Sequence, residues 1–334
     1  MLLPDLDPRF AASVTPDFLR GLGDEELFAL VDAVEERVGR EVAKVEDRAT
    51  AAERRLSREL LDDWRGDLDP ILVDELLDLP AEAVSIPEVE RLLGRTDARM
   101  RERDTSSALT SLGIALGAFY LGAKRRVRDL AGESGRRIEL TLTRGNIREI
   151  GSLSNQGVYW IGEYWGRHLS RTILATVERE AALRGLGRLE VGQILRGAVN
   201  GTFPMAAVPG TYRGSPEAYF AQLAGDVRTR GLAFGSVSAF EAGGFVRYRI
   251  EAVLDERTSE ICRFMHNRTF AVSEGRSLVD RLVSAEDPED VKSIAGWRTA
   301  AEARELAERG DLANAGLALP PYHGRCRTVV VPES

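Results

Sequence analysis

The sequence predicts a mainly α N-terminal region with long helices, followed by a smaller α+β C-terminal domain. Two observations indicate the helical region: apolar residues recur at helical spacing through 24–64, and an apolar run extends over 107–123. The third observation is a change of pattern near the end of the chain. There, 248–254 and 327–332 are short runs whose alternation or β-branched content is typical of strands.

A chain of 334 residues is long enough for two or three domains. We place an irregular arm at 1–22, the helical region at 23–205 and the α+β domain at 215–334. The chain is 43% hydrophobic and 29% charged, as in an ordinary globular protein. Its net charge of −8 excludes a protein that coats nucleic acid with its whole surface, while a local basic patch stays compatible with it.

The N-terminal residues show neither a secretory signal nor a cysteine framework. No basic segment followed by an apolar run opens the chain, so we expect synthesis in the cytoplasm. The chain holds two cysteines, which cannot hold together a domain of this size, so apolar burial must stabilise the fold.

The first helix is predicted from Asp24, which is placed to cap it, to about Trp64. Its apolar positions are spaced by about 3.7 residues per turn, the spacing of an eleven-residue repeat. Such a nearly straight helix with one apolar stripe must pack on another helix of the same chain or on another chain. Both alternatives remain open.

Short helices are predicted at 70–77 and 87–93, because each stretch begins at a proline. A second long helix is predicted from about Thr96 and contains the apolar run 107–123. Because this run only just reaches the length of a membrane span and contains hydroxyl residues, we expect a helix buried in a bundle rather than in a membrane. Four basic residues follow it: Lys124, Arg125, Arg126 and Arg128. We interpret them as a solvated helix end, where the helix dipole favours cations, and they are also the best candidates for any contact with DNA.

Three further helices are predicted, at 155–184, 188–199 and 216–240. The aromatic residues of the first recur at helical period, so we expect them in a core or interface rather than stacked on bases. His168 in this helix is interpreted as a packing or surface histidine. The loop 200–216, rich in glycine and proline, is the candidate domain boundary. The segment 135–150 fits either a short strand or the start of a helix.

The residues that carry chemistry are concentrated in the C-terminal part. Both cysteines, Cys262 and Cys326, and two of the three histidines, His266 and His323, lie in two short segments. On a helix, a cysteine and a histidine four positions apart point the same way, and His-x-x-Cys has the spacing of a metal-binding turn. Together they supply two sulfurs and two imidazoles for a closed, structural zinc site. A disulfide between the cysteines and ordinary packing are the alternatives.

The surrounding residues carry a resemblance to a known family. They are Asp255, Glu256, Arg257 and Thr258, then Cys262 and Phe270, and finally His323, Cys326 and Arg327 before a β run. Over about 220–332 this order is similar to the C-terminal domain of the phage Mu F-like family, the minor head or head morphogenesis proteins of tailed phages. Many members have a cysteine where Ser259 or Glu260 stands and another at the position of Thr328, so His266 would substitute for one lost ligand.

The resemblance implies a non-enzymatic role in assembly. Such proteins associate with the portal or the inner head surface and aid capsid assembly or DNA delivery. For this chain it implies the portal protein, other capsid components and packaged DNA as partners, with passage from the cytoplasm into a virion or phage-derived particle.

Two further expectations concern the chemistry of the site. The structural motif would consist of Asp255, Arg257, Thr258 and Arg327, with each arginine pairing with a carboxylate such as Asp255. The alternative function is a Cys/His enzyme, either a thiol hydrolase or a metal-dependent nuclease.

Overall fold

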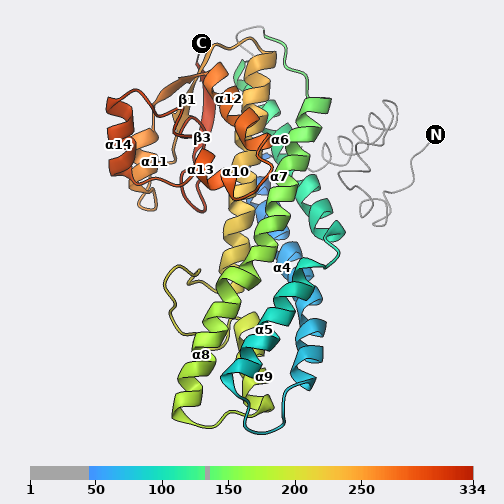
Figure 1. Cartoon of the computed structure of the whole chain (residues 1–334). Coiled ribbons are helices and arrows are strands. Elements are labelled where there is room, and N and C mark those ends of the chain that lie inside the picture. Colours follow the sequence, from blue (N-terminus) through green and yellow to red (C-terminus); the bar gives the residue numbers. More distant parts are fainter. Residues whose placement is uncertain (1–44, 132–135, 334) are drawn as a thin grey trace, which may run out of the picture.

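The computed structural model of the chain describes residues 45–131 and 136–333 (Figure 1). Its helices are α4 Val45–Leu77, α5 Ile86–Arg101, α6 Ser106–Ala131, α7 Arg144–Glu163, the π-helix η2 Tyr164–Leu169, α8 Ser170–Leu183, α9 Arg188–Val199, α10 Pro216–Ala242, α11 Glu260–Met265, α12 Val272–Val283, α13 Asp290–Ile294 and α14 Ala300–Glu308. Its strands are β1 Arg247–Glu251, β2 Thr269–Ala271 and β3 Val329–Glu333. The predicted fold class, long helices followed by a smaller α+β part, is confirmed.

The first predicted helix lies only partly within the described residues. Its start at Asp24 and the predicted arm 1–22 fall outside them. Its end is later than predicted, because α4 passes Trp64 and Pro70 without a break and ends at Leu77. The apolar stripe of the sequence therefore belongs to a helix that is longer than its periodicity indicated.

The separate helix predicted at 70–77 is thus wrong. A proline inside a helix removes one backbone hydrogen bond, but Leu68 and Leu72 on either side of it are buried, so packing keeps the helix continuous. The sequence prediction also joined the end of α5 and the whole of α6 into one helix. The second long helix, α6, starts at Ser106 rather than near Thr96, since α5 extends past that residue.

The predicted helix 155–184 is part of a longer, composite element. The α7 helix starts earlier, at Arg144, because the Thr143 hydroxyl caps it by accepting from the Asn146 N–H. The segment 135–150, which the sequence left open between a strand and the start of a helix, thus contains the start of α7: residues 144–150 are helical, and 136–143 are neither helix nor strand. The π-helix then separates α7 from α8. Tyr164 and Trp165 at this point are buried in the core as predicted, whereas the other two aromatic residues, Tyr159 and Trp160, are half-buried.

The α6 helix lies in the core of the bundle, where it packs against α10, α7 and α4. Leu112 and Leu116 on it are fully buried. Among the described helices it is the one that is long and apolar enough to cross a membrane, and half of its apolar window is buried inside this structure. Length and composition alone do not separate a membrane span from a buried bundle helix of this kind.

The α10 helix connects the two parts of the fold (Figure 1). It packs against α6, α4 and α7 and also against α12 and β3. Its crossing with α6 is close: a Cβ on Gly231 would lie 3.0 Å from Phe119 Cβ, and one on Gly235 would lie 2.5 Å from the Tyr120 carbonyl oxygen. The predicted boundary is a loop, as expected, but the helix that follows it lies inside the bundle.

The sheet has β1 at its centre, with β2 and β3 antiparallel on either side. Tyr248 on β1 faces Phe270 on β2 and Pro332 on β3. The predicted pairing of 327–332 with the strand near 248–254 is therefore confirmed. Tyr248 and Ile250 are buried while their neighbours are partly exposed, which is the alternation expected of a sheet with one packed face.

Candidate metal centre

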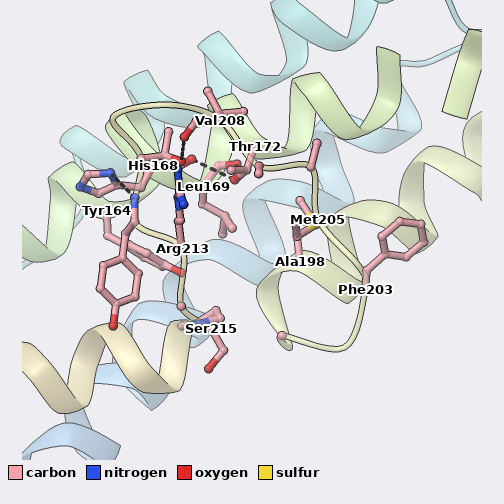
Figure 2. Close-up of a pocket in the computed structure, with 17 residues that line it drawn as sticks. Tyr164, His168, Leu169, Thr172, Ala198, Phe203, Met205, Val208, Arg213 and Ser215 are labelled. Atoms are coloured by element: carbon pink, nitrogen blue, oxygen red, sulfur yellow. Dashed lines mark hydrogen bonds between the residues drawn. The ribbon is translucent and has the colours of Figure 1, made fainter. Parts of the chain in front are cut away.

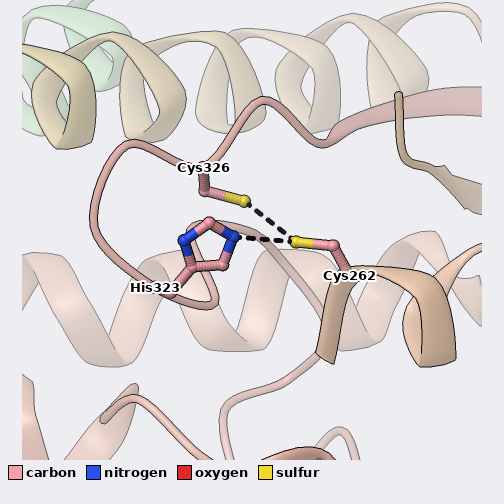
Figure 3. A group of neighbouring side chains, drawn as sticks. All are labelled: Cys262, His323 and Cys326. Carbon is pink, nitrogen blue, oxygen red and sulfur yellow. Dashed lines mark hydrogen bonds between the residues drawn. The ribbon is translucent and has the colours of Figure 1, made fainter. Parts of the chain in front are cut away.

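Three of the four predicted ligands come together in the C-terminal part (Figure 3). Cys262, His323 and Cys326 each offer one ligand atom, and these atoms all lie within 4.8 Å of one another. Cys262 Sγ lies 3.1 Å from His323 Nε2 and 3.6 Å from Cys326 Sγ. Both thiols are free and buried. Two sulfurs and one imidazole nitrogen thus converge, which is a donor set that zinc prefers.

Helix α11 positions the first of these residues. The Ser259 hydroxyl caps the helix by accepting from the Cys262 N–H at 3.3 Å. Ile261 and Met265 on the same short helix are buried and anchor it to the core. The cysteine in the first turn therefore points inward, toward the segment before β3 (Figure 3).

Helix α10 positions the other two residues, His323 and Cys326. The Thr229 hydroxyl donates to the Cys326 carbonyl oxygen at 2.7 Å. A Cβ on Gly324 would lie 2.6 Å from Cδ of the Gln222 side chain, so this turn lies directly against the helix. The His-x-x-Cys turn, 323–326, thus lies against α10, the central helix of the fold.

The His323 ring has the tautomer that suits a metal ligand. Its Nδ1 lies 2.8 Å from the Gly324 carbonyl oxygen, which can only accept, so Nδ1 carries the proton. In the neutral ring the lone pair is then on Nε2, the atom that faces Cys262 Sγ. Metal-bound histidines usually have this arrangement, with the second nitrogen fixed by a carbonyl or carboxylate.

The two thiols differ in acidity because they interact with each other. The hydrogen bond with Cys326 lowers the pKa of Cys262 to about 6. The same contact and burial raise the pKa of Cys326 to about 12. The pKa of His323 is raised, chiefly by a hydrogen bond with Cys326. One proton therefore leaves the thiol pair readily, which yields the thiolate form that binds metals.

His266 does not belong to this group, contrary to the prediction. Helix α11 ends at Met265, and the backbone of His266 has left the helix with φ −55° and ψ 134°. Its Nδ1 accepts a hydrogen bond from the Ala252 N–H at 3.2 Å. Because the helix stops one residue too early, the four-residue spacing from Cys262 no longer directs both side chains to one point. The predicted four-ligand site is a group of three.

A second contact fastens the same two segments at the surface. Both Nη atoms of Arg327 donate to the Asp255 carboxylate, at 2.8 and 2.6 Å, in a bidentate pair. The Arg327 guanidinium holds the pKa of Asp255 well below its usual range. Arg257 contributes its backbone N–H to Asp255 at 2.9 Å rather than its side chain, and the Thr258 hydroxyl accepts from the Asp255 N–H at 2.7 Å. The predicted motif thus holds one of its two arginine pairs.

The predicted DNA contact loses one of its residues. Lys124 is buried, with 4% of its surface exposed, and its ammonium donates to the Thr141 carbonyl oxygen. Arg125 and Arg126 are half-buried, and Arg128 lies 3.6 Å from the Asp129 carboxylate. A run of basic residues in the sequence does not indicate which of these residues the folded bundle buries.

Sequence reasoning missed a cavity beneath the 200–215 loop (Figure 2). Its volume is about 250 Å³, and Tyr164, His168, Met205 and Arg213 lie among its lining residues. The lone histidine accepts from the Tyr212 N–H through Nδ1 at 3.1 Å and thus ties the loop to the π-helix. Glycine and proline indicated the loop, but no signal in the sequence indicated the π-helix that places His168 under it.

The group of three residues can act chemically in two ways. It can coordinate a metal ion, or Cys262 and His323 can act as nucleophile and base. No protein-family model, curated protein or solved structure matches this chain. The geometry of its own residues therefore has to decide between these uses.

Proposed function

We propose that Cys262, His323 and Cys326 hold a structural zinc ion and that the chain is a non-enzymatic assembly protein of a tailed phage or phage-derived particle. One observation supports the zinc ion above all, namely the spacing of the ligand atoms. Tetrahedral zinc bonds place sulfur and nitrogen ligands roughly 3.5 to 3.8 Å apart. The two sulfurs, 3.6 Å apart, lie within this range, whereas His323 Nε2, at 3.1 Å from Cys262 Sγ, is closer than the range and at a hydrogen-bond distance.

The position of the centre favours a structural role over a catalytic one. Cys262 is 3% exposed and Cys326 is fully buried. A zinc ion bound there would join α11 to the turn before β3, and Thr229 already bonds that turn to α10. The cavity beneath the 200–215 loop has neither cysteine in its lining. Zinc would thus close the α+β part onto the central helix.

The assembly role is supported by the order of motif residues around the centre and by the long helix α4, which has exposed residues along its length. The protein would associate with the portal or inner head surface, and the arginines Arg125, Arg126 and Arg128 remain the candidates for contact with packaged DNA. It would be made in the cytoplasm and then enter the particle.

Metal analysis of protein purified without a histidine tag tests the zinc ion. We expect about one equivalent of zinc in the wild type, none in Cys262→Ser, and an unchanged content in the matched variant His266→Ala, because this histidine faces Ala252. Wild-type protein without zinc would refute the proposed centre.

Co-purification with the portal tests the assembly role. The chain is expressed together with portal and major capsid proteins, and its incorporation into rings or particles is measured. We expect Cys262→Ser to lose folding of the α+β part and incorporation together, while His266→Ala keeps both. A well-folded wild-type protein that does not co-purify with the portal would contradict this role.

A thiol hydrolase is the second candidate, because one observation favours it. Cys262 Sγ lies 3.1 Å from His323 Nε2, the distance of a nucleophile from its base, and the hydrogen bond with Cys326 lowers the pKa of this thiol to about 6. Metal-free protein is mixed with activated esters and the first turnover is followed. A product burst that disappears in Cys262→Ser would favour the enzyme, and no burst would favour the structural centre.

A further inference from the structure

Three protein ligands leave one coordination position of a tetrahedral zinc ion, and we propose that the carboxylate of Asp226 fills it. This assignment rests on the zinc centre proposed above. The identity of the fourth donor has a functional consequence. Structural zinc sites take all four ligands from the protein, whereas catalytic sites keep one position for water or substrate. A fourth protein ligand would therefore separate the structural centre from the metal-dependent nuclease.

Asp226 lies on the face of α10 that holds the ligand turn. Thr229, one turn further along this helix, bonds the Cys326 carbonyl oxygen at 2.7 Å. A Cβ on the adjacent Gly225 would lie 3.6 Å from Arg325 Cα. Residues three and four apart share one face of a helix. The carboxylate at 226 therefore faces the same short turn that supplies two of the three ligands.

One oxygen of this carboxylate has no partner. Asp226 Oδ1 is buried and accepts no hydrogen bond from any described residue. Buried polar atoms are nearly always paired, and a bound ion is one of the few explanations for an exception. Buried carboxylates in proteins are paired with cations or coordinate metals. The backbone N–H of Arg325 acts on the same carboxyl, so the group is held near the turn while Oδ1 remains available.

The Asp226 carboxyl also interacts electrostatically with two of the three ligands. Burial raises the pKa of Asp226 to about 7, and the charges of Cys326 and His323 both act on it. Zinc with two thiolates and a neutral imidazole has no net charge, so a carboxylate would add one negative charge. Arg230 acts on Asp226 and is placed to balance that charge, whereas Arg327, which acts on both thiols, is already paired with Asp255.

Thr328 is the competing donor. It is 3% exposed, and its hydroxyl acts on the pKa of both thiols. A neutral hydroxyl is not among the usual zinc ligands, which are thiolate, imidazole and carboxylate. Asp226 lies outside the set of atoms within 4.8 Å, so coordination requires its carboxyl to move toward the three ligands.

Zinc affinity of the purified full chain, measured by competition with a chromophoric chelator, tests the assignment. We expect Asp226→Asn to weaken zinc binding by at least about 10- to 100-fold, since losing even an outer partner of a ligand costs that much. One matched variant should bind as the wild type does. Glu53→Gln removes a carboxylate of α4 that pairs at 2.9 Å with Arg228, a residue of the same helix as Asp226.

Cobalt(II) in place of zinc reports the fourth position directly. Wild-type cobalt protein should keep its absorption spectrum when azide is added, because the protein fills all four positions. In Asp226→Asn, azide should reach the open position and shift the spectrum. An azide shift in the wild type would overturn the assignment and indicate the open coordination position of a catalytic site.

Two outcomes distinguish the failure of this assignment from the failure of the zinc centre. If Asp226→Asn binds zinc as tightly as the wild type does, the assignment of Asp226 is overturned and the zinc centre stands. A wild type that binds no zinc overturns the centre and the assignment with it. Thermal melts in the presence of chelator check that the variant folds. Asp226→Asn should melt at no lower a temperature than the wild type, because it replaces a buried carboxylate by an uncharged amide. If it melts lower, Asp226→Cys replaces it, and retained zinc affinity supports a ligand at this position.

Discussion

Cys262 gives the centre its dependence on pH. An ordinary thiol ionises near pH 8.5, whereas contact with Cys326 lowers the pKa of Cys262 to about 6. We expect the ultraviolet thiolate absorbance of the metal-free protein to rise around pH 6, and this step to be missing in Cys262→Ser. A first step near pH 8.5 in the wild type would contradict the contact between the thiols.

The same shift predicts how stability changes with pH. Because the pKa of Cys262 is lower in the folded protein than in the unfolded chain, its thiolate stabilises the fold above the unfolded pKa. That contribution is lost as the pH falls through about 6. The free energy of unfolding of the metal-free wild type, relative to Cys262→Ser, should therefore decrease from pH 8.5 to pH 6.

Thr328 offers a way to strengthen the site. Its side chain is buried beside both sulfurs and is close to cysteine in size. Thr328→Cys should raise zinc affinity by at least about tenfold, because thiolate is a stronger zinc donor than the groups it would displace. Chelator competition measures this change, and weaker binding would contradict it.

A double variant then connects this prediction to the fourth ligand. Once a third thiolate is present, Asp226→Asn should lose most of its effect on zinc affinity. Two groups that compete for one coordination position give non-additive changes in binding free energy. Additive changes would mean that Asp226 and residue 328 act at separate places.

At the scale of elements, the crossing of α6 and α10 depends on Gly235. A Cβ there would lie 2.5 Å from the Tyr120 carbonyl oxygen, a backbone atom that cannot move aside alone. Gly235→Ala should lower the free energy of unfolding by about 1–3 kcal/mol, the usual cost of overpacking. Urea denaturation measures the change.

Gly122 on α6 provides the matched control. A Cβ at this position meets no atom within 4 Å. Gly122→Ala should therefore stabilise the protein by about 0.5–1 kcal/mol, because alanine loses less backbone entropy in a helix. Equal stability of the two alanine variants would contradict the close crossing.

A buried polar network joins the bundle to the C-terminal part. Glu149 on α7 accepts hydrogen bonds from Tyr120 on α6 and, at 2.8 Å, from Arg276 on α12. Asn146 donates to the same tyrosine hydroxyl at 3.1 Å and to Ser238 on α10. Four helices thus share one set of satisfied polar groups, which fixes their relative positions more specifically than apolar contact alone.

At the scale of the whole molecule, the buried apolar residues of both parts belong to one cluster. The cluster extends from Leu56 on α4 to Val330 on β3, and α10 packs on both parts. We therefore expect the described parts of the chain to unfold together, in spite of the loop that indicated a domain boundary.

Zinc removal tests this cooperativity. A ligand present at a hundred times its dissociation constant stabilises the folded state by about 2.7 kcal/mol. Excess zinc should shift urea denaturation by this amount, both in the tryptophan fluorescence, to which Trp64, Trp160 and Trp165 in the bundle contribute, and in the reactivity of Cys326. A shift confined to the thiol would mean that the α+β part unfolds separately.

The sequence by itself determined the helical class, the pairing of the two C-terminal strands, and three members of the candidate centre. Periodicity and strand alternation are local properties of the chain, so they can be read without knowing what packs on them. Cys262, His323 and Cys326 were identifiable because their residue types are rare in this chain and carry specific chemistry.

Only the tertiary structure decided the remaining features. The end of α11 removed His266 from the centre, burial withdrew Lys124 from solvent, and packing carried α4 through Pro70. The face of α10 brought Asp226 to the ligand turn, a hundred residues further along the chain. Helix ends, burial and such distant contacts depend on the atoms that other segments place nearby, and that information is not contained in any local stretch of sequence.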